Sequence, residues 1–129
     1  MKRTIVSALL FFVLAIGIAG CDESSEAGDV VKKFFALAQK EKDSDAMKYV
    51  ISDVVNELKN NPSGYEKAAK LFIEDLTEQR CDVEIVDDHL WQEQAKIECS
   101  VKLKDGTKKK KIIVLKREDD GTEWKITNE

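Results

Sequence analysis

The chain lacks the residues on which most metal sites and catalytic sites depend. Its 129 residues include one histidine, His89, which lies beside Asp87 and Asp88 in a predicted turn. A zinc site usually takes several His or Cys ligands at close spacing, and a hydrolytic triad needs a histidine beside its nucleophile. The sequence contains no Gly-x-Ser-x-Gly motif and no Cys-x-x-Cys pair. Neither a metal, a cofactor, nucleophilic catalysis nor redox chemistry is therefore expected.

The chain also lacks an excess of positive charge. It has 21 Lys and Arg against 25 Asp and Glu, a formal net charge of −4. A protein that binds nucleic acid needs a basic face to neutralise phosphates. Nucleic acid is therefore not an expected partner.

The first twenty residues differ from all that follow. Met1-Lys2-Arg3 is a basic start, and residues 5–20 carry no charge. This pattern is typical of a signal peptide, and the apolar run is slightly short for a membrane-spanning helix. The stretch Ile-Ala-Gly-Cys at 18–21 resembles the lipobox of bacterial lipoproteins. The resemblance implies cleavage after Gly20, diacylglycerol on the Cys21 sulfur, and a fatty acyl chain such as palmitate on the new amino end.

The expected organisation follows from that anchor. Residues 1–20 are a cleaved signal peptide, residues 21–28 a lipidated tether of small and polar residues, and residues 29–129 one domain. Several acyl chains on Cys21 would give stable membrane attachment. Asp22 resembles the signal that keeps some lipoproteins on the periplasmic face of the inner membrane. The expected location is the bacterial cell envelope.

Apolar residues in the first half of the domain recur at helical spacing. The pattern predicts a helix from Asp29 to about residue 40, shorter helices between 43 and 58, and a helix over 65–76. After Arg80 the period changes to two, which predicts strands over about 81–85, 92–104, 112–115 and 124–126. Helices followed by an antiparallel meander predict an α+β fold, with helices packed on a curved sheet of about four strands. The inward strand positions hold no acidic residue, which disfavours acid–base catalysis.

The opening of the domain carries a family resemblance. The stretch DVVKKFFAL at 29–37, a charged break, and DAMKY at 45–49 resemble small lipoproteins of unknown function in the cystatin-like, nuclear-transport-factor-two-like superfamily. The resemblance implies a cone-shaped fold over most of residues 29–127 and a homodimer through the sheet. The superfamily includes isomerases, dehydratases and binding modules, so fold does not settle function. We expect a non-catalytic binding or scaffolding domain; alternatives are a carrier of a small apolar ligand in the cone, or an isomerase-like enzyme.

Cys81 and Cys99 remain after Cys21 is used for lipid. If the turn lies at 88–91, residues whose numbers sum to about 180 face each other, and Cys81 and Cys99 do. In an oxidising compartment this predicts a disulfide; the alternative is two free buried thiols.

Lysines gather around the predicted Asp105-Gly106 hairpin turn: Lys102, Lys104, Lys108, Lys109, Lys110 and Lys111. They can solubilise the hairpin and discourage edge pairing. They can also contact anionic lipid, a cell-wall polymer or an acidic envelope protein. Trp91 and Trp124 are expected to pack in the core or at its rim, or to line an apolar cavity in the cone.

Overall fold

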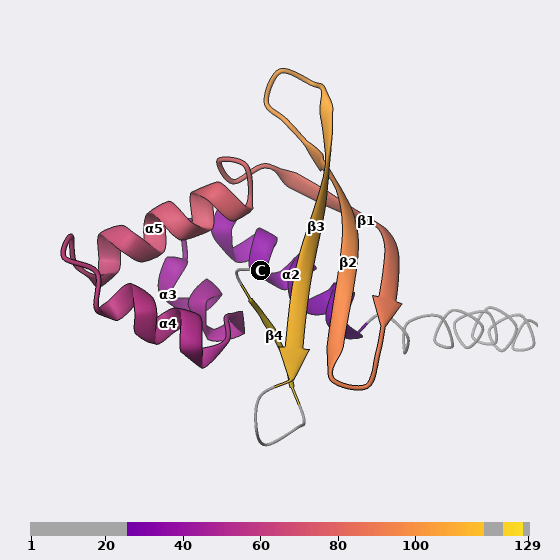
Figure 1. Cartoon of the computed structure of the whole chain (residues 1–129). Coiled ribbons are helices and arrows are strands. Elements are labelled where there is room, and N and C mark those ends of the chain that lie inside the picture. The colour runs from indigo at the N-terminus through magenta and orange to yellow at the C-terminus, as the bar shows by residue number, and fades with distance from the viewer. Residues whose placement is uncertain (1–25, 118–122, 128–129) are drawn as a thin grey trace, which may run out of the picture.

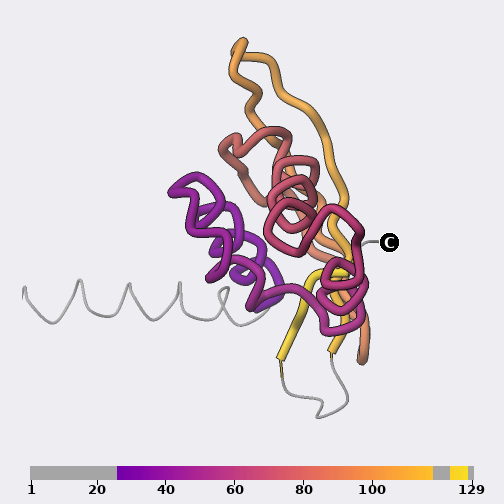
Figure 2. The backbone as a smooth tube through the Cα atoms, turned by 90° about the vertical axis from the view of Figure 1, so that its left-hand side faces the viewer, coloured from indigo at the N-terminus to yellow at the C-terminus, as the bar shows by residue number. Residues whose placement is uncertain are grey.

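The computed structural model describes residues 26–117 and 123–127, which form a helical layer packed on one antiparallel sheet (Figures 1 and 2). The helices come first and the sheet second, as the sequence predicts. The helical elements are α2 (Glu26–Gln39), α3 (Asp43–Ala46), the 3₁₀ helix η1 (Met47–Tyr49), α4 (Ser52–Lys59) and α5 (Tyr65–Leu76). The strands are β1 (Asp82–Leu90), β2 (Gln94–Lys102), β3 (Lys108–Arg117) and β4 (Trp124–Ile126), in the spatial order β1-β2-β3-β4.

The predicted signal peptide, the lipid on Cys21 and the retention signal at Asp22 lie outside the described residues. The tether prediction needs one correction. Residues 26–28 belong to α2 and not to the tether, because Ala27 is fully buried in the core and continues the apolar face of the helix. Within residues 26–117 and 123–127, no helix is long and apolar enough to cross a membrane.

Helix α2 is the centre of the core. Its buried face carries Val31, Phe34, Phe35 and Ala38, with the two phenylalanine rings edge to face at 6.4 Å. Full burial of such a side chain stabilises a fold by about 1.5–3 kcal/mol. The helix packs against β1 at one side of the sheet and β4 at the other.

A bulge interrupts β1. The strand pairs with β2 antiparallel, with Ile85 opposite Cys99, and the register shifts between Ile85 and Asp87. One extra residue inverts the inward–outward alternation beyond it. Asp88 consequently lies opposite Ile97, which is fully buried on the inward face. The prediction that no acidic residue takes an inward position is therefore wrong at Asp88.

Strand β4 completes the core. Trp124 and Ile126 are buried, and the backbone N–H of Ile51 donates to the Ile126 carbonyl at 2.9 Å. The Arg117 guanidinium lies 4.5 Å above the Trp124 ring. Large, fully buried side chains fill the space between α2, α5 and the sheet: Phe34, Phe35, Ile73, Ile97, Ile113, Leu115 and Ile126.

Candidate functional site

The predicted lysine patch lies on the hairpin that joins β2 to β3, which projects beyond the helices (Figure 1). Residues directly opposite each other in a sheet share a face. Lys109 and Lys111 lie opposite Val101 and Cys99, both fully buried inward residues. Lys108 and Lys110 alternate with them and take the outward face. The strand period thus divides the patch into two groups with different surroundings.

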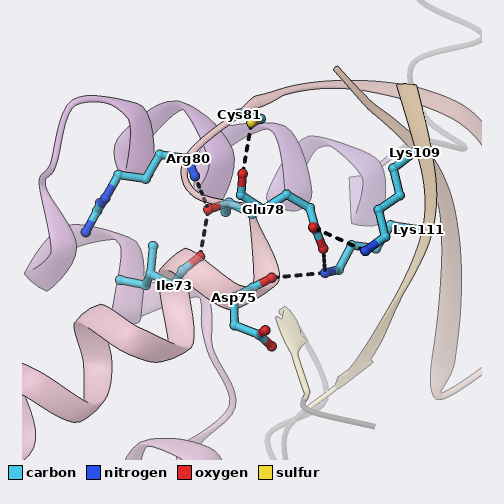
Figure 3. Close-up of polar contacts among 8 residues, drawn as sticks. Ile73, Asp75, Glu78, Arg80, Cys81, Lys109 and Lys111 are labelled. Atoms are coloured by element: carbon cyan, nitrogen blue, oxygen red, sulfur yellow. Dashed lines mark hydrogen bonds and ion pairs between the residues drawn. The ribbon is translucent and has the colours of Figure 1, made fainter. Parts of the chain in front are cut away.

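The inward lysines bind one carboxylate (Figure 3). Glu78 accepts from the Lys111 ammonium and from Lys109 at 3.2 Å, and Lys111 also donates to the Asp75 carbonyl at 3.0 Å. The hydrogen bond from Lys111 holds the pKa of Glu78 below its ordinary value, with Lys109 adding to the effect. These two lysines attach the hairpin to the segment that follows α5, and Glu78 balances part of their charge. The Lys111 side chain is mostly buried, at 19% exposed, whereas that of Lys109 is 54% exposed.

The turn between α5 and β1 has unusual backbone geometry. Glu78, Gln79 and Arg80 have φ angles of 53°, 65° and 67°, the left-handed region in which a side chain crowds the following carbonyl. Each such residue costs about 1–2 kcal/mol. The Thr77 hydroxyl braces the turn, since it donates to the Ile73 carbonyl at 2.7 Å and accepts from the Arg80 N–H at 2.9 Å.

Arg80 connects this turn to the other helices. Its guanidinium donates to both Asp43 oxygens, at 2.8 and 3.1 Å, and to the Ala38 carbonyl at 2.8 Å. Asp43, assisted by Glu74, raises the pKa of Arg80. The end of α2, the start of α3 and the end of α5 therefore meet at one side chain. This network fixes the position of the α5–β1 turn relative to the helices.

The outward lysines have different surroundings. Lys102 and Lys108 lie directly opposite each other, Lys104 follows in the turn, and all three are exposed. None has an ion-pair partner in the described part of the chain. Lys110 lies 3.5 Å from Glu98, but its side chain is 70% exposed, and such pairs contribute little. Like charges directly opposite each other destabilise a sheet, so the Lys102–Lys108 pair lowers the stability of the hairpin.

The hairpin turn holds these lysines in a defined place. Asp105 accepts hydrogen bonds from the Thr107 N–H at 2.9 Å and its hydroxyl at 2.7 Å, which lower the pKa of Asp105. Gly106 has a φ of 93°, which a side chain would disfavour. The tip is therefore an ordered turn surrounded by three ammonium groups that pair with no carboxylate in residues 26–117 or 123–127.

The register that suggested a disulfide is wrong. Facing residues before the bulge sum to 184 and not to 180, so Cys99 faces Ile85. Cys81 lies four residues earlier, about 13 Å along the chain, whereas a disulfide needs Cα atoms within about 7 Å. Both cysteines are free and buried, and burial raises the pKa of Cys99 to about 12. The structure does not bring the two sulfurs together.

The remaining candidate residues, His89, Trp91 and Trp124, lie in different surroundings. His89 lies on β1 with its Nε2 3.4 Å from an Asp87 oxygen, and both side chains are exposed. Trp124 is core, whereas Trp91 is 55% exposed beside the β1–β2 turn. Among the residues that the structure describes, no group of three or more His, Cys, Asp or Glu could hold a metal ion.

A groove of about 880 Å³ lies between α3 and the start of α5, outside the interior of the cone. Its walls carry acidic residues such as Glu41 and Glu66 and basic residues such as Lys67 and Lys70. Sequence reasoning missed this groove, because it joins segments 41–47 and 63–70, which no local pattern brings together.

Comparison with known proteins gives fold information. No protein-family model matches the chain, and no curated protein matches it. A crystal structure from Campylobacter jejuni, provisionally described as an NTF2-like transpeptidase, matches with a TM-score of 0.55. The match covers 81% of this chain and 100% of that one, at 15% sequence identity. The chain therefore has an NTF2-like α+β fold with an open, curved four-stranded sheet, as the resemblance implied.

Proposed function

We propose that this protein is a lipid-anchored component of the bacterial cell envelope whose domain binds an anionic wall polymer through Lys102, Lys104 and Lys108. The observation that carries the proposal is the division of the patch. Lys109 and Lys111 pair with Glu78 and Lys110 lies near Glu98, whereas Lys102, Lys104 and Lys108 have no ion-pair partner among the described residues and lie on an ordered tip. Edge protection accounts for lysines on β3, whose residues 108–113 have only β2 beside them in the described part of the chain. It does not account for Lys102, because β2 is paired on both sides.

The position of the tip favours a polymer over the protein's own bilayer. The hairpin lies at one end of the molecule and the start of α2, next to the proposed anchor, at the other (Figures 1 and 2). A protein held by Cys21 would thus present its free lysines away from the membrane to which it is attached. Peptidoglycan carries carboxylates that a row of ammonium groups can bind.

Catalysis is the alternative suggested by the C. jejuni structure's description. Several observations favour binding over acyl transfer. The sequence contains no Ser-x-x-Lys motif, Cys81 and Cys99 are buried, and His89 contacts Asp87 rather than a nucleophile. A covalent adduct after incubation with a β-lactam, detected as added protein mass, would favour the enzyme.

A carrier of an apolar ligand is the other alternative. Large side chains fill the cone, and the groove between α3 and α5 has charged walls. Native mass spectrometry of the gently purified protein tests this idea. A reproducible added mass of an apolar compound would favour the carrier.

The polymer proposal is tested by replacing Lys102, Lys104 and Lys108 with glutamine. A lysine near an anionic surface contributes about 1 kcal/mol, so the triple variant should bind purified peptidoglycan sacculi about 100-fold more weakly at low salt. The control replaces Lys32, Lys33 and Lys42, which are exposed and make the same change in net charge. Equal losses in the two variants, or no binding by the unchanged protein, would refute the proposal. If the unchanged protein binds an acidic envelope protein and not the sacculi, the lysines recognise a protein and the polymer proposal is wrong.

A further inference from the structure

The β1–β2 turn lies at the same end of the molecule as the start of α2 (Figures 1 and 2). This turn spans residues 91–93, and two consecutive exposed apolar side chains lie at its start, Leu90 at the end of β1 and Trp91 in the turn. Leu90 is 40% exposed and Trp91 is 55% exposed. The backbone N–H of Trp91 donates to the Gln94 carbonyl at 2.7 Å, so the backbone of the turn is tight. Two neighbouring apolar side chains are therefore open to solvent at this end of the molecule.

The chemistry of the turn is that of a membrane interface. Tryptophan is enriched at the level of lipid headgroups, where its ring is apolar and its N–H can reach water or a headgroup. The Lys96 ammonium lies over the Trp91 ring, 5.9 Å from its centre, where it can also bind a lipid phosphate. Glu93 is exposed in the same turn, so the contact is shallow and does not enter the hydrocarbon.

The length of chain before α2 determines which surface this end can meet. Only residues 22–25 separate Cys21 from Glu26, where α2 begins. Five extended steps reach about 17 Å at most. A lipid on Cys21 would therefore hold the start of α2, and the end of the domain around it, close to the bilayer.

We infer that Leu90 and Trp91 form a membrane seat: a shallow contact with the bilayer to which the protein is anchored. The inference rests on the lipid anchor of the proposed function and adds an orientation to it. This contact orients the domain with the β1–β2 turn at the membrane and the lysine tip of the β2–β3 hairpin directed away from it.

The test uses the full chain, isolated with its native modification and reconstituted in vesicles of phosphatidylethanolamine and phosphatidylglycerol. Some vesicles carry phosphatidylcholine brominated near the headgroup, which quenches tryptophan at that depth. The sequence has two tryptophans, so quenching of Trp91 alone should remove roughly half of the emission. The Trp91→Phe variant should lose almost none, because Trp124 is buried in the core.

Absence of quenching in the unchanged protein, or equal quenching in the Trp91→Phe variant, would overturn the seat. Flotation of the vesicles separates this failure from a failure of the anchor. If the unchanged protein floats with the vesicles but shows no quenching, the anchor stands and the seat is wrong. If the protein carries no lipid mass and does not float, the proposed function and the seat both fail.

Discussion

Replacing Gln79 with glycine tests whether the α5–β1 turn is strained. The residue has a φ of 65°, and its exposed side chain has no hydrogen-bond partner among the described residues. Glycine removes the crowding between Cβ and the next carbonyl, which costs about 1–2 kcal/mol. It also gives the unfolded chain more freedom, which offsets about 0.5–1 kcal/mol of that gain. The free energy of unfolding should therefore rise by about 0.5–1 kcal/mol.

The matched control places glycine where the backbone is helical. Lys70 is exposed in the interior of α5, and glycine there should lower the free energy of unfolding by about 1 kcal/mol. The same new residue should thus give opposite signs at two exposed positions. Both variants can be made in a secreted form that begins at Asp22.

Urea unfolding followed by circular dichroism measures the effect, and thermal unfolding checks it. A change of 1 kcal/mol moves the Tm of a domain of this size by about 4–8 °C, so Gln79→Gly should raise the Tm by about 2–8 °C. If Gln79→Gly lowers the stability as much as Lys70→Gly does, the turn is not strained and this account of it is wrong.

Three further predictions concern the same region. The lowered pKa of Glu78 means that its pairing with Lys111 stabilises the fold above the ordinary value of 4.5 and is lost as the pH falls through the lower folded pKa. The stability difference between the unchanged protein and Glu78→Gln should therefore shrink on acidification in urea titrations, and a constant difference would contradict it. Arg80→Lys removes the paired hydrogen bonds to Asp43 and should cost about 1–3 kcal/mol in urea unfolding; no loss would show that the junction is unimportant. In the secreted form, denatured without reductant, both Cys81 and Cys99 should react with an alkylating reagent, whereas in the native protein the two buried thiols should react slowly. If the denatured protein has no reactive thiol, Cys81 and Cys99 form a disulfide after all.

The order and type of the elements could be predicted because periodicity is a local property. The stripe from Tyr65 to Leu76 predicts α5 with its observed bounds, and Asp105-Gly106 predicts the hairpin turn that the structure contains. Strand register is not local. The bulge between Ile85 and Asp87 has no mark in the alternation, and it extends β1 to Leu90, well past the predicted strand. The error in register led directly to the disulfide prediction.

The candidate site divides in the same way. The lysine patch could be placed at the hairpin from sequence, but four consecutive lysines at 108–111 carry no apolar partner to say which pair points inward. The inward pair is identified by its contact with Glu78, which lies 31 residues before Lys109. Glu78 stands in a left-handed turn that the local sequence does not predict. The sequence alone therefore could not show which lysines of the hairpin lack an ion-pair partner among the described residues.

Strand β4 has a consequence for biogenesis. Ile126 is fully buried and bonded to Ile51, and α2 packs against β4 across nearly the whole described chain. The core therefore cannot close until residues 124–126 are present. A chain that crosses a membrane through a narrow channel must stay unfolded in transit. In the exported protein that we propose, a core that requires β4 delays folding until residues 124–126 have crossed the membrane.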